Sequence, residues 1–483
     1  MRLNKALYKD YKQYPERIIQ FGEGNFLRAF ADWIIDMLNK EQEFNSGVLV
    51  VQPRDSNRVY KLNNQDGLFT LLINGLNKGE PVQDKRIVNS ITRGINTYKE
   101  YDEFLKAAEN PDMRFMISNT TEAGIVYEEN DSLENRPQSS FPGKLTAFLY
   151  HRYKTFNGDL SKGLLLLPCE LIDKNGDRLK EIILKLSIDW ALGEDFIHWI
   201  NNANIFYNTL VDRIVPGYPK EKALDIEKKL GYEDSFLVEC EYFYLWVIEG
   251  PKDIKNELPT DKLDLNVLFV EDLTPYRTRK VRILNGVHTS MVPVSYLYGI
   301  DTVKDSVEDE VVGKFINSLL FNEIIPTLDL PSKELKDYAN DVIDRFRNPF
   351  IKHYLMSISL NSMSKFKTRV LPSILEYIER KNELPNKLLF SFAALIAFYK
   401  GERNGEKIQL SDNREYLNMF SELWGNYNGT DEHIINIVET VLGLVGLWEI
   451  NLNSIEGLKD QVIRYLSSIE RNGIKKAINE VLE

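Results

Sequence analysis

The first half of the chain alternates short β-rich runs with amphipathic helical patterns, and this alternation restricts the fold more than any other feature. RIIQF, residues 17–21, is predicted to be a buried strand. FLRAFADWIIDMLN follows it, with apolar residues at the spacing of a helix that has one buried face. Strands that alternate with helices in this way form parallel sheets covered by helices. Further strands are predicted at VLVV (48–51), LFTLLING (68–75), RFMISN (114–119) and LLLL (164–167).

From about residue 275 the pattern changes to long helical periodicities with few β-rich runs between them. Examples are GKFINSLLFNEIIPTL, LKDYANDVIDRF, KLLFSFAALIAFYKG and EHIINIVETVLGLVGLW. This part of the chain is predicted to be mostly α-helical. The expected fold class is therefore α/β, with a parallel-sheet domain over residues 1–275 followed by a mostly helical domain over residues 276–483.

The composition excludes several classes of partner. The net charge of the 483-residue chain is −12 and its Lys and Arg residues form no basic block, so neither nucleic acid nor an anionic membrane is an expected partner. The longest apolar run, LLFSFAALIAFY at 388–399, is shorter than the roughly 20 residues that cross a bilayer. The N-terminus lacks the apolar core of a signal peptide, so a cytoplasmic protein is expected.

Cysteine usage also indicates a cytoplasmic protein. Cys169 and Cys240 are the two cysteines of the chain, and they lie far apart without a CxxC spacing. They support neither a disulfide framework nor a structural zinc, and they indicate a reducing compartment. No Cys/His/Glu set with the spacing of metal ligands can be assembled, so no metal is expected. The oligomeric state stays open.

Gly22 and Gly24, in RIIQFGEGNFLRAF, follow a predicted strand and precede a predicted helix. A dinucleotide-binding fold needs glycine here for the tight turn and for the approach of backbone N–H groups to a pyrophosphate. Leu27 stands where GxGxxG has its third glycine, so the motif is incomplete. A plain strand-to-helix turn, or the S-adenosylmethionine site of a methyltransferase, would also have these two glycines.

Two further segments are expected at the same edge of the sheet. Arg54 and Asp55 follow the second strand, where an acid would suit the ribose hydroxyls of NAD and an arginine would suit the extra phosphate of NADP, so both cofactors stay open. The SNTTEAG loop, residues 118–124, follows a later strand. Because the carboxyl ends of parallel strands meet at one edge, this loop and its Thr120 are expected near the cofactor.

RKVRILNGVHTS, residues 279–290, places three polar side chains in an apolar run. On an α-helix Lys280, Asn285 and His288 would lie at roughly 0°, 140° and 80°, which is one broad face. Oxidation of an alcohol by hydride transfer needs a base for the hydroxyl proton and donors that stabilise the alkoxide, and this set provides both. Alternatively, Lys280 is a solvated lysine, Asn285 and Gly286 interrupt the helix, and His288 is a core residue.

These residues resemble a known family. Lys280, Asn285 and His288 have the spacing of the signature of the polyol-specific long-chain dehydrogenases, the mannitol dehydrogenase family, and GxGxFxRAF resembles its nucleotide loop. SNTTEAGI, SFPGKLTAFLY, LPCELIDKNG and LMSISLNSMSKFKTRVLP are most similar to the branch of the family that interconverts tagaturonate and altronate. The resemblance extends over nearly the whole chain.

The resemblance implies a Rossmann-like N-terminal domain, a helical C-terminal domain, a catalytic site between them and no metal. It implies that Lys280 is the general acid/base and that Asn285 and His288 bind and polarise the reacting oxygen. The residues of the nucleotide loop implied to bind NAD are Gly22, Gly24, Asn25, Phe26 and Arg28.

Substrate-binding residues are implied with two departures from the mannitol branch. Asp212 in LVDRIVP and Lys365 in SLNSMSK resemble residues that contact substrate, although ordinary ion-paired surface residues would also fit these positions. Where the mannitol branch has CDN or CEN, with an asparagine in the oxyanion hole, this chain has CEL, so a second donor is missing or is supplied by Asn175.

The second departure is Arg277, which stands three residues before Lys280, where the mannitol branch tends to have an acid. A guanidinium binds a carboxylate at two points, so Arg277 favours a sugar acid over a neutral polyol. The expected function is the NAD-dependent reduction of tagaturonate to altronate. The alternatives are a fructuronate reductase, a neutral-polyol dehydrogenase such as a mannitol 2-dehydrogenase, a methyltransferase, or an NAD-binding protein without turnover.

Overall fold

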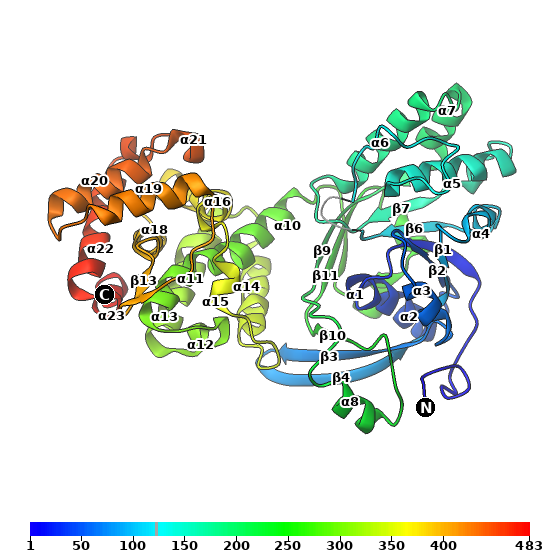
Figure 1. The fold of residues 1–483 in the computed structure, drawn as a ribbon, viewed down its shortest axis with the longest axis horizontal. Coiled ribbons are helices and arrows are strands. Elements are labelled where there is room, and N and C mark those ends of the chain that lie inside the picture. Colours follow the sequence, from blue (N-terminus) through cyan, green and yellow to red (C-terminus); the bar gives the residue numbers. More distant parts are fainter. Residues whose placement is uncertain (121–123) are drawn as a thin grey trace. The chain divides into compact units, whose positions relative to one another are not determined.

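The chain divides into two compact units in the computed structural model, which describes residues 1–120 and 124–483. The first unit comprises Met1–Asn74 and Pro81–Leu273, and the second comprises Gly75–Glu80 and Thr274–Glu483. The first is built around a parallel sheet and the second is almost entirely helical (Figure 1), which confirms the predicted fold class.

The central sheet of the first unit has six strands in the order β5-β2-β1-β6-β7-β8. Every neighbouring pair in it is parallel. This is the 3-2-1-4-5-6 order of doubly wound dinucleotide-binding folds, in which the strand order reverses beside the first strand. Ligands of such sheets bind at that reversal, which here lies between β1 and β6. The strands are β1 (Glu16–Phe21), β2 (Gly47–Gln52), β5 (Ile91–Asn96), β6 (Phe115–Ser118), β7 (Leu165–Pro168) and β8 (Ile205–Phe206).

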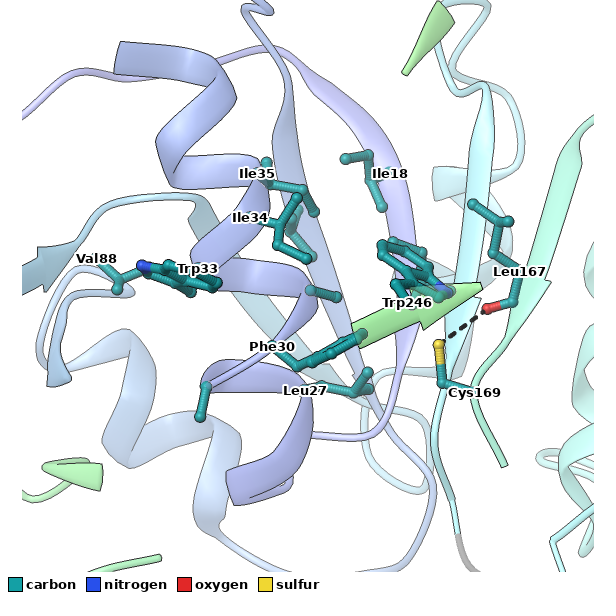
Figure 2. Close-up of a cluster of buried hydrophobic side chains, with 14 of the residues drawn as sticks. Ile18, Leu27, Phe30, Trp33, Ile34, Ile35, Val88, Leu167, Cys169 and Trp246 are labelled. Carbon is teal, nitrogen blue, oxygen red and sulfur yellow. Dashed lines mark hydrogen bonds between the residues drawn. The ribbon is translucent and has the colours of Figure 1, made fainter. Parts of the chain in front are cut away.

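Alternate residues of these strands point to opposite faces of the sheet, and each face has its own buried core. Ile18 packs with α1 and α2 on one face, whereas Ile19 packs with α4 to α7 on the other. Figure 2 shows the first of these cores, which includes Ile18, Phe30 and Trp246. Burial on both faces explains why the strands are continuous apolar runs. The helices are α1 (Asn25–Arg28), α2 (Ala31–Glu41), α4 (Tyr101–Ala107), α5 (Phe141–Thr155), α6 (Asn175–Asp189) and α7 (Glu194–Ala203).

The single helix predicted over residues 26–39 is wrong in one respect, because the chain forms two helices there. α1 ends at Arg28 and α2 begins at Ala31. Phe30 between them has φ −130° and ψ −85°, outside the helical region, and its ring packs 5.0 Å from Phe26 and 5.4 Å from Trp246. The break allows α1 and α2 to bury different faces against the same core.

Two smaller sheets complete the first unit. One has the order β10-β3-β4 and the other β12-β11-β9. The predicted strand at 68–75 belongs to β3 in the first of these and not to the central sheet. Their strands are β3 (Phe69–Asn77), β4 (Glu80–Val88), β9 (Asn208–Asp212), β10 (Val238–Glu241), β11 (Leu245–Glu249) and β12 (Val267–Val270).

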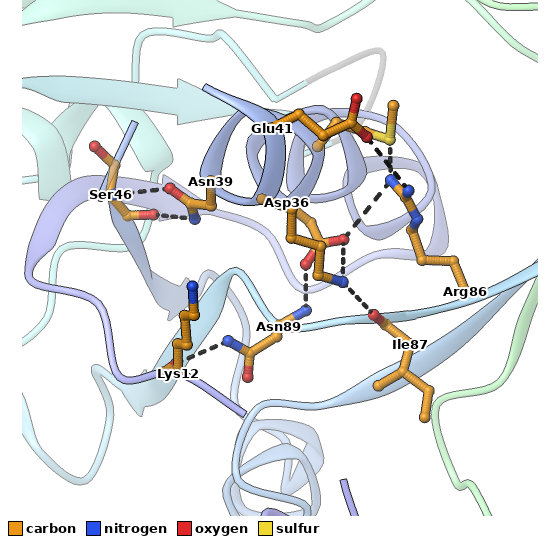
Figure 3. A network of polar contacts seen from close by, with 10 residues as sticks. Lys12, Asp36, Asn39, Glu41, Ser46, Arg86, Ile87 and Asn89 are labelled. Carbon is orange, nitrogen blue, oxygen red and sulfur yellow. Dashed lines mark hydrogen bonds and ion pairs between the residues drawn. The ribbon is translucent and has the colours of Figure 1, made fainter. Parts of the chain in front are cut away.

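Polar contacts join the end of β4 to helix α2 (Figure 3). Asp36 accepts a hydrogen bond from the backbone N–H of Asn89 at 2.9 Å, and the ammonium of Lys40 donates to the carbonyl oxygen of Ile87 at 3.0 Å. The other end of the β3–β4 hairpin belongs to the second unit, where the N–H of Gly79 donates to Asp344 at 2.9 Å.

The core of the second unit is α18 (Asn386–Phe398), every residue of which from Leu388 onward is buried. This is the longest apolar run of the sequence, and it packs against α11 and α22. Among the described residues, no helix is long and apolar enough to cross a membrane. The helical segments of this unit are α10 (Thr274–Arg279), η3 (Lys280–Gly286), α11 (Val287–Tyr298), α12 (Val303–Glu308), α13 (Glu310–Ser318), η4 (Leu319–Ile324), α14 (Ser332–Phe346), α15 (Leu355–Ile358), α16 (Ser362–Arg369), α17 (Leu371–Lys381), α18, α19 (Arg414–Gly425), α20 (Asp431–Leu442), α21 (Val445–Trp448), α22 (Leu458–Asn472) and α23 (Ile474–Leu482).

Candidate active site

The glycine loop lies at the carboxyl end of β1, next to the reversal of strand order. Gly22 has φ +117°, and a Cβ there would lie 2.8 Å from the carbonyl oxygen of Asn119, at the end of β6. Only glycine allows this close approach in this conformation. A Cβ on Gly24 would meet no atom within 4 Å, so the space in front of Gly24 is open. The backbone of the loop can therefore approach a ligand at this point.

Arg28 lies behind this loop and not on its surface. Its side chain is 1% exposed, and its guanidinium donates to the carbonyl oxygen of Phe236 and, at 2.6 Å, to the side-chain oxygen of Asn25. The same group lies 5.3 Å from the ring of Phe69 and 5.1 Å from that of Phe236. Burial lowers the pKa of Arg28 to about 10, so it remains charged at neutral pH. These contacts fix Asn25 from behind, whereas the ring of Phe26 is partly exposed.

The segment after β2 is held by amide side chains. Gln52 is buried at the strand end and donates to the carbonyl oxygen of Ser56 at 2.8 Å. Asn96, at the end of β5, donates to Asp55 at 3.2 Å and to Ser56 at 2.9 Å. Asp55 and Arg54 are both exposed. Arg54 also lines a cavity of about 240 Å³ with Pro53, Thr120, Gly124, Ser139 and Ser140, at the carboxyl edge of the sheet.

A buried carboxylate joins the ends of β6 and β7 at this edge. Glu170 accepts hydrogen bonds from the N–H and the hydroxyl of Thr120 at 3.0 and 3.1 Å, and from the hydroxyl of Ser118 at 3.0 Å. Burial raises the pKa of Glu170, and these donors oppose that shift. The SNTTEAG loop is predicted to lie near the cofactor. Its residues 121–123 lie outside the described residues.

Asn175 is used inside the first unit. Its side-chain nitrogen donates to the carbonyl oxygens of Pro168, Glu170 and Thr209 at 2.9, 3.1 and 3.1 Å, and its oxygen accepts from the N–H of Thr209 at 2.8 Å. It is fully buried. Asn175 therefore ties β7 to β9 in this structure. Asp212, at the end of β9, is also buried and is not a surface residue.

Lys280 and Asn285 lie in a π-helical segment, η3, that continues α10 and runs on into α11. The α-helical angles given above for these residues are therefore wrong. In a π-helix the hydrogen bonds join residues five apart, so Lys280 and Asn285 lie about one turn apart on the same side. His288 follows three residues later, in the first turn of α11. The extra residue of the π-turn thus aligns the three side chains better than an α-helix would.

Gly286 does not interrupt the helix, since it has the helical dihedrals φ −65° and ψ −48°. A Cβ at this position would lie 2.9 Å from the carbonyl oxygen of Arg369, the last residue of α16. Glycine therefore lets α16 pack closely against η3, directly beside Asn285.

The imidazole of His288 is clamped between two rings of the second unit. The ring of Phe346 lies 4.3 Å away at 31°, and that of His353 lies 5.1 Å away, edge on at 79°. His288 is 8% exposed. Burial lowers the pKa of His353, which favours the neutral ring beside His288. The packing restricts the orientation of His288.

Cationic side chains gather near η3 in the second unit. Arg277 is half-buried in α10, and burial lowers its pKa. Lys365 in α16 is half-buried and donates to the carbonyl oxygen of Ile358 at 2.8 Å. The pKa of Lys365 is lowered by burial and then by the charge of Arg369. Arg369 lies outside the SLNSMSK motif that indicated Lys365 in the sequence, although its position four residues after Lys365 places the two on one helix face.

No group of three or more His, Cys, Asp or Glu side chains suited to a metal ion occurs in the part of the chain that the structure describes.

Comparison with protein families decides the relationship of the chain. The mannitol dehydrogenase Rossmann domain matches residues 16–262, and the mannitol dehydrogenase C-terminal domain matches residues 272–470. The chain belongs to the mannitol dehydrogenase family. Members of the mannitol dehydrogenase family are oxidoreductases, and this chain is one of them.

Relatives within the mannitol dehydrogenase family match over almost the whole chain. The altronate oxidoreductase of Bacillus subtilis (strain 168) is 51% identical over 479 residues, covering 99% of this chain and 98% of the relative. That of Escherichia coli O6:K15:H31 is 51% identical over 471 residues, covering 96% and 97%.

Two solved structures share the fold of this chain at lower sequence identity. A substrate-free D-sorbitol dehydrogenase matches 99% of this chain and 100% of its own with a TM-score of 0.81 and 22% identity. The mannitol 2-dehydrogenase of Pseudomonas fluorescens, in complex with NAD and D-mannitol, matches 100% and 99% with a TM-score of 0.66 and 22% identity.

Proposed function

We propose that this oxidoreductase uses NAD to interconvert tagaturonate and altronate. The observation that carries the proposal is the 51% identity, over nearly the full length of both chains, to altronate oxidoreductases. The physiological direction we propose is reduction of the ketone. The arrangement of polar side chains along η3 and at the carboxyl edge of the sheet suits this chemistry.

The first unit, within residues 1–275, is proposed to hold the cofactor. Bound NADH supplies a hydride to the carbonyl carbon of the substrate, and NAD⁺ accepts it in the reverse direction. The open backbone at Gly22 and Gly24 fits a pyrophosphate, with Asn25 and Phe26 at the same turn. Arg28 would position this loop from behind.

Thr120 and Asp55 would complete the cofactor site at the sheet edge. Asp55 is an acid after the second strand, which suits the ribose hydroxyls of NAD. For this reason we propose NAD, and not NADP, as the preferred cofactor. The exposed Arg54 beside it is the reason to measure NADPH as well.

The second unit, which includes Thr274–Glu483, is proposed to carry the acid/base group. Lys280 would give a proton to the carbonyl oxygen as the ketone is reduced and take it back in oxidation. Asn285 and His288 would donate hydrogen bonds to the same oxygen as negative charge develops there. No metal has a role in this proposal.

Asp212, Arg277 and Lys365 are proposed to bind the hydroxyls and the carboxylate of the substrate. We leave Asn175 out of the proposed oxyanion site, because its amide hydrogens already serve three carbonyl oxygens of its own unit. Leu171 of the CEL sequence has no side-chain donor, so Asn285 and His288 are the proposed donors to the reacting oxygen.

NADH oxidation measured separately with tagaturonate, fructuronate and fructose tests this function. Tagaturonate is expected to give the highest kcat/KM, and altronate is the expected product. A preference for fructuronate would instead make the protein a fructuronate reductase, and a preference for fructose would make it a neutral-polyol dehydrogenase. Cofactor binding without oxidation of NADH by any of the three would contradict the proposal altogether.

A further inference from the structure

We propose that Arg369, together with Lys365, binds the carboxylate of the sugar-acid substrate. This inference rests on the proposed function and deepens it, because it names the residues that would distinguish a sugar acid from a neutral sugar. Arg369 is the last residue of α16, and Lys365 lies one turn before it on the same helix.

Arg369 has no anionic partner among the described residues, unlike several other arginines of the second unit. It is half-buried, and its guanidinium makes no ion pair or hydrogen bond with any residue that the structure describes. By contrast, Arg279 pairs with Glu334 at 2.6 Å, Arg380 pairs with Asp329 at 2.7 Å, and Arg403 pairs with Asp301 at 2.7 Å. A half-buried guanidinium without a counter-ion is a ready receptor for an external anion.

The charge of Lys365 adds to that of Arg369. Two like charges four residues apart on a helix repel each other, and burial strengthens the repulsion. Lys365 is held by the carbonyl oxygen of Ile358, which leaves its charge uncompensated. The carboxylate that raises the pKa of Lys365 is Asp412, which already accepts hydrogen bonds from the N–H of Met363 at 3.1 Å and from the hydroxyl of Tyr399. A substrate carboxylate between the two cations would relieve this repulsion.

Arg369 is also correctly placed in the second unit for this role. Its carbonyl oxygen lies 2.9 Å from where a Cβ of Gly286 would be, and Gly286 directly follows Asn285. The proposed anion site and the proposed oxyanion donors are therefore on segments in direct contact. Arg369 also has a structural role to be separated from anion binding, because a cation at a helix C-terminus interacts favourably with the helix dipole. That interaction needs no substrate.

The test compares an acidic substrate with its neutral counterpart. Reduction of tagaturonate and of tagatose, which has CH2OH in place of the carboxylate, is measured for wild type, Arg369→Gln, Arg369→Lys and Lys367→Gln. Lys367 is the matched control, because it lies on the same helix and removal of its charge affects a surface pair with Glu449. Melting temperatures of all four proteins are recorded.

Arg369→Gln is expected to lower kcat/KM for tagaturonate by about 10- to 100-fold, the value of a hydrogen-bonded charge pair, while kcat/KM for tagatose stays unchanged. Arg369→Lys should recover part of the loss, added guanidinium ion should restore activity to Arg369→Gln, and Lys367→Gln should resemble wild type. If Arg369→Gln lowers kcat/KM equally for both substrates, or for neither, the proposed role of Arg369 is wrong although the proposed function stands. If the wild-type protein has a higher kcat/KM for tagatose than for tagaturonate, the proposed function itself is contradicted.

Discussion

Glu170 accepts hydrogen bonds from both polar groups of Thr120, from its backbone N–H at 3.0 Å and from its hydroxyl at 3.1 Å. Ser118 donates to the other carboxylate oxygen at 3.0 Å. A single buried carboxylate therefore fixes the chain where β6 ends, and Thr120 lines the cavity beside Arg54. Glu170 therefore positions a residue in the wall of this cavity.

Glu170→Ala is expected to raise the KM for NADH by about 10- to 100-fold, because Thr120 loses the hydrogen bonds that position it beside the proposed cofactor site. Hydrogen bonds to a charged group contribute about 1.5–3 kcal/mol each. NADH titrations and melting curves measure this effect. Glu323→Gln is the control, since Glu323 is an equally buried carboxylate that accepts from the N–H groups of Lys387 and Leu388 in the other unit. Equal KM values for NADH in the two variants would show that Glu170 is merely structural.

Replacement of Lys280 by Met is expected to lower kcat by about 100- to 10,000-fold, the usual contribution of a general acid or base. The dissociation constant for NADH should not change, because Lys280 belongs to the other unit from the glycine loop. Stopped-flow measurement of NADH oxidation, with fluorescence titration of NADH, separates the two effects. Lys367→Met serves as the control. A Lys280→Met enzyme with near-normal kcat would exclude lysine acid/base catalysis.

Gly286→Ala should disturb the packing of α16 against η3, because the added Cβ would lie 2.9 Å from the carbonyl oxygen of Arg369. Overpacking of this kind costs about 1–3 kcal/mol of stability. Gly425→Ala, in α19, adds a Cβ that meets no atom within 4 Å, and it should change stability by less than about 1 kcal/mol. Chemical denaturation of both variants tests the close contact. Equal stability of the two variants would contradict it.

Glu323 should make the second unit less stable as the pH rises. Burial raises its pKa from 4.5 to about 7, so between these values the folded chain keeps a proton that the unfolded chain has lost. Raising the pH through this window favours the unfolded chain and removes up to about 3 kcal/mol. Denaturation at several pH values should show this slope in wild type and a flatter one in Glu323→Gln. Parallel slopes would mean that Glu323 does not titrate in this window.

Much of the first unit could be predicted from its sequence. The parallel strands are continuous apolar runs because both of their faces are buried, and the runs at 17–21, 48–51, 114–119 and 164–167 lie in the central sheet. The strand at 68–75 could be predicted as a strand but not assigned to its own small sheet, because its pairing with β10 joins residues far apart in the sequence. The attachment of Gly75–Glu80 to the second unit depends on a contact with Asp344 that no local pattern indicates.

The candidate site could be predicted in residue type more than in geometry. The spacing of Lys280, Asn285 and His288 indicated one helix face, but an apolar run gives no local sign of a π-turn, which changes the relative angles of the side chains. Nor does the sequence indicate which polar side chains are buried. Arg28 and Asn175 look like ligand-binding residues in the sequence, whereas tertiary contacts with Phe236 and Thr209 place both inside the first unit.

Competition for a limited amount of NADH tests the central claim most directly. Equal concentrations of tagaturonate, fructuronate and fructose are mixed with the wild-type protein and NADH, and the products are quantified by chromatography once the NADH is consumed. The product ratios report the ratios of kcat/KM. We predict that altronate accounts for nearly all of the NADH oxidised. Mannonate or mannitol as the main product would contradict the account.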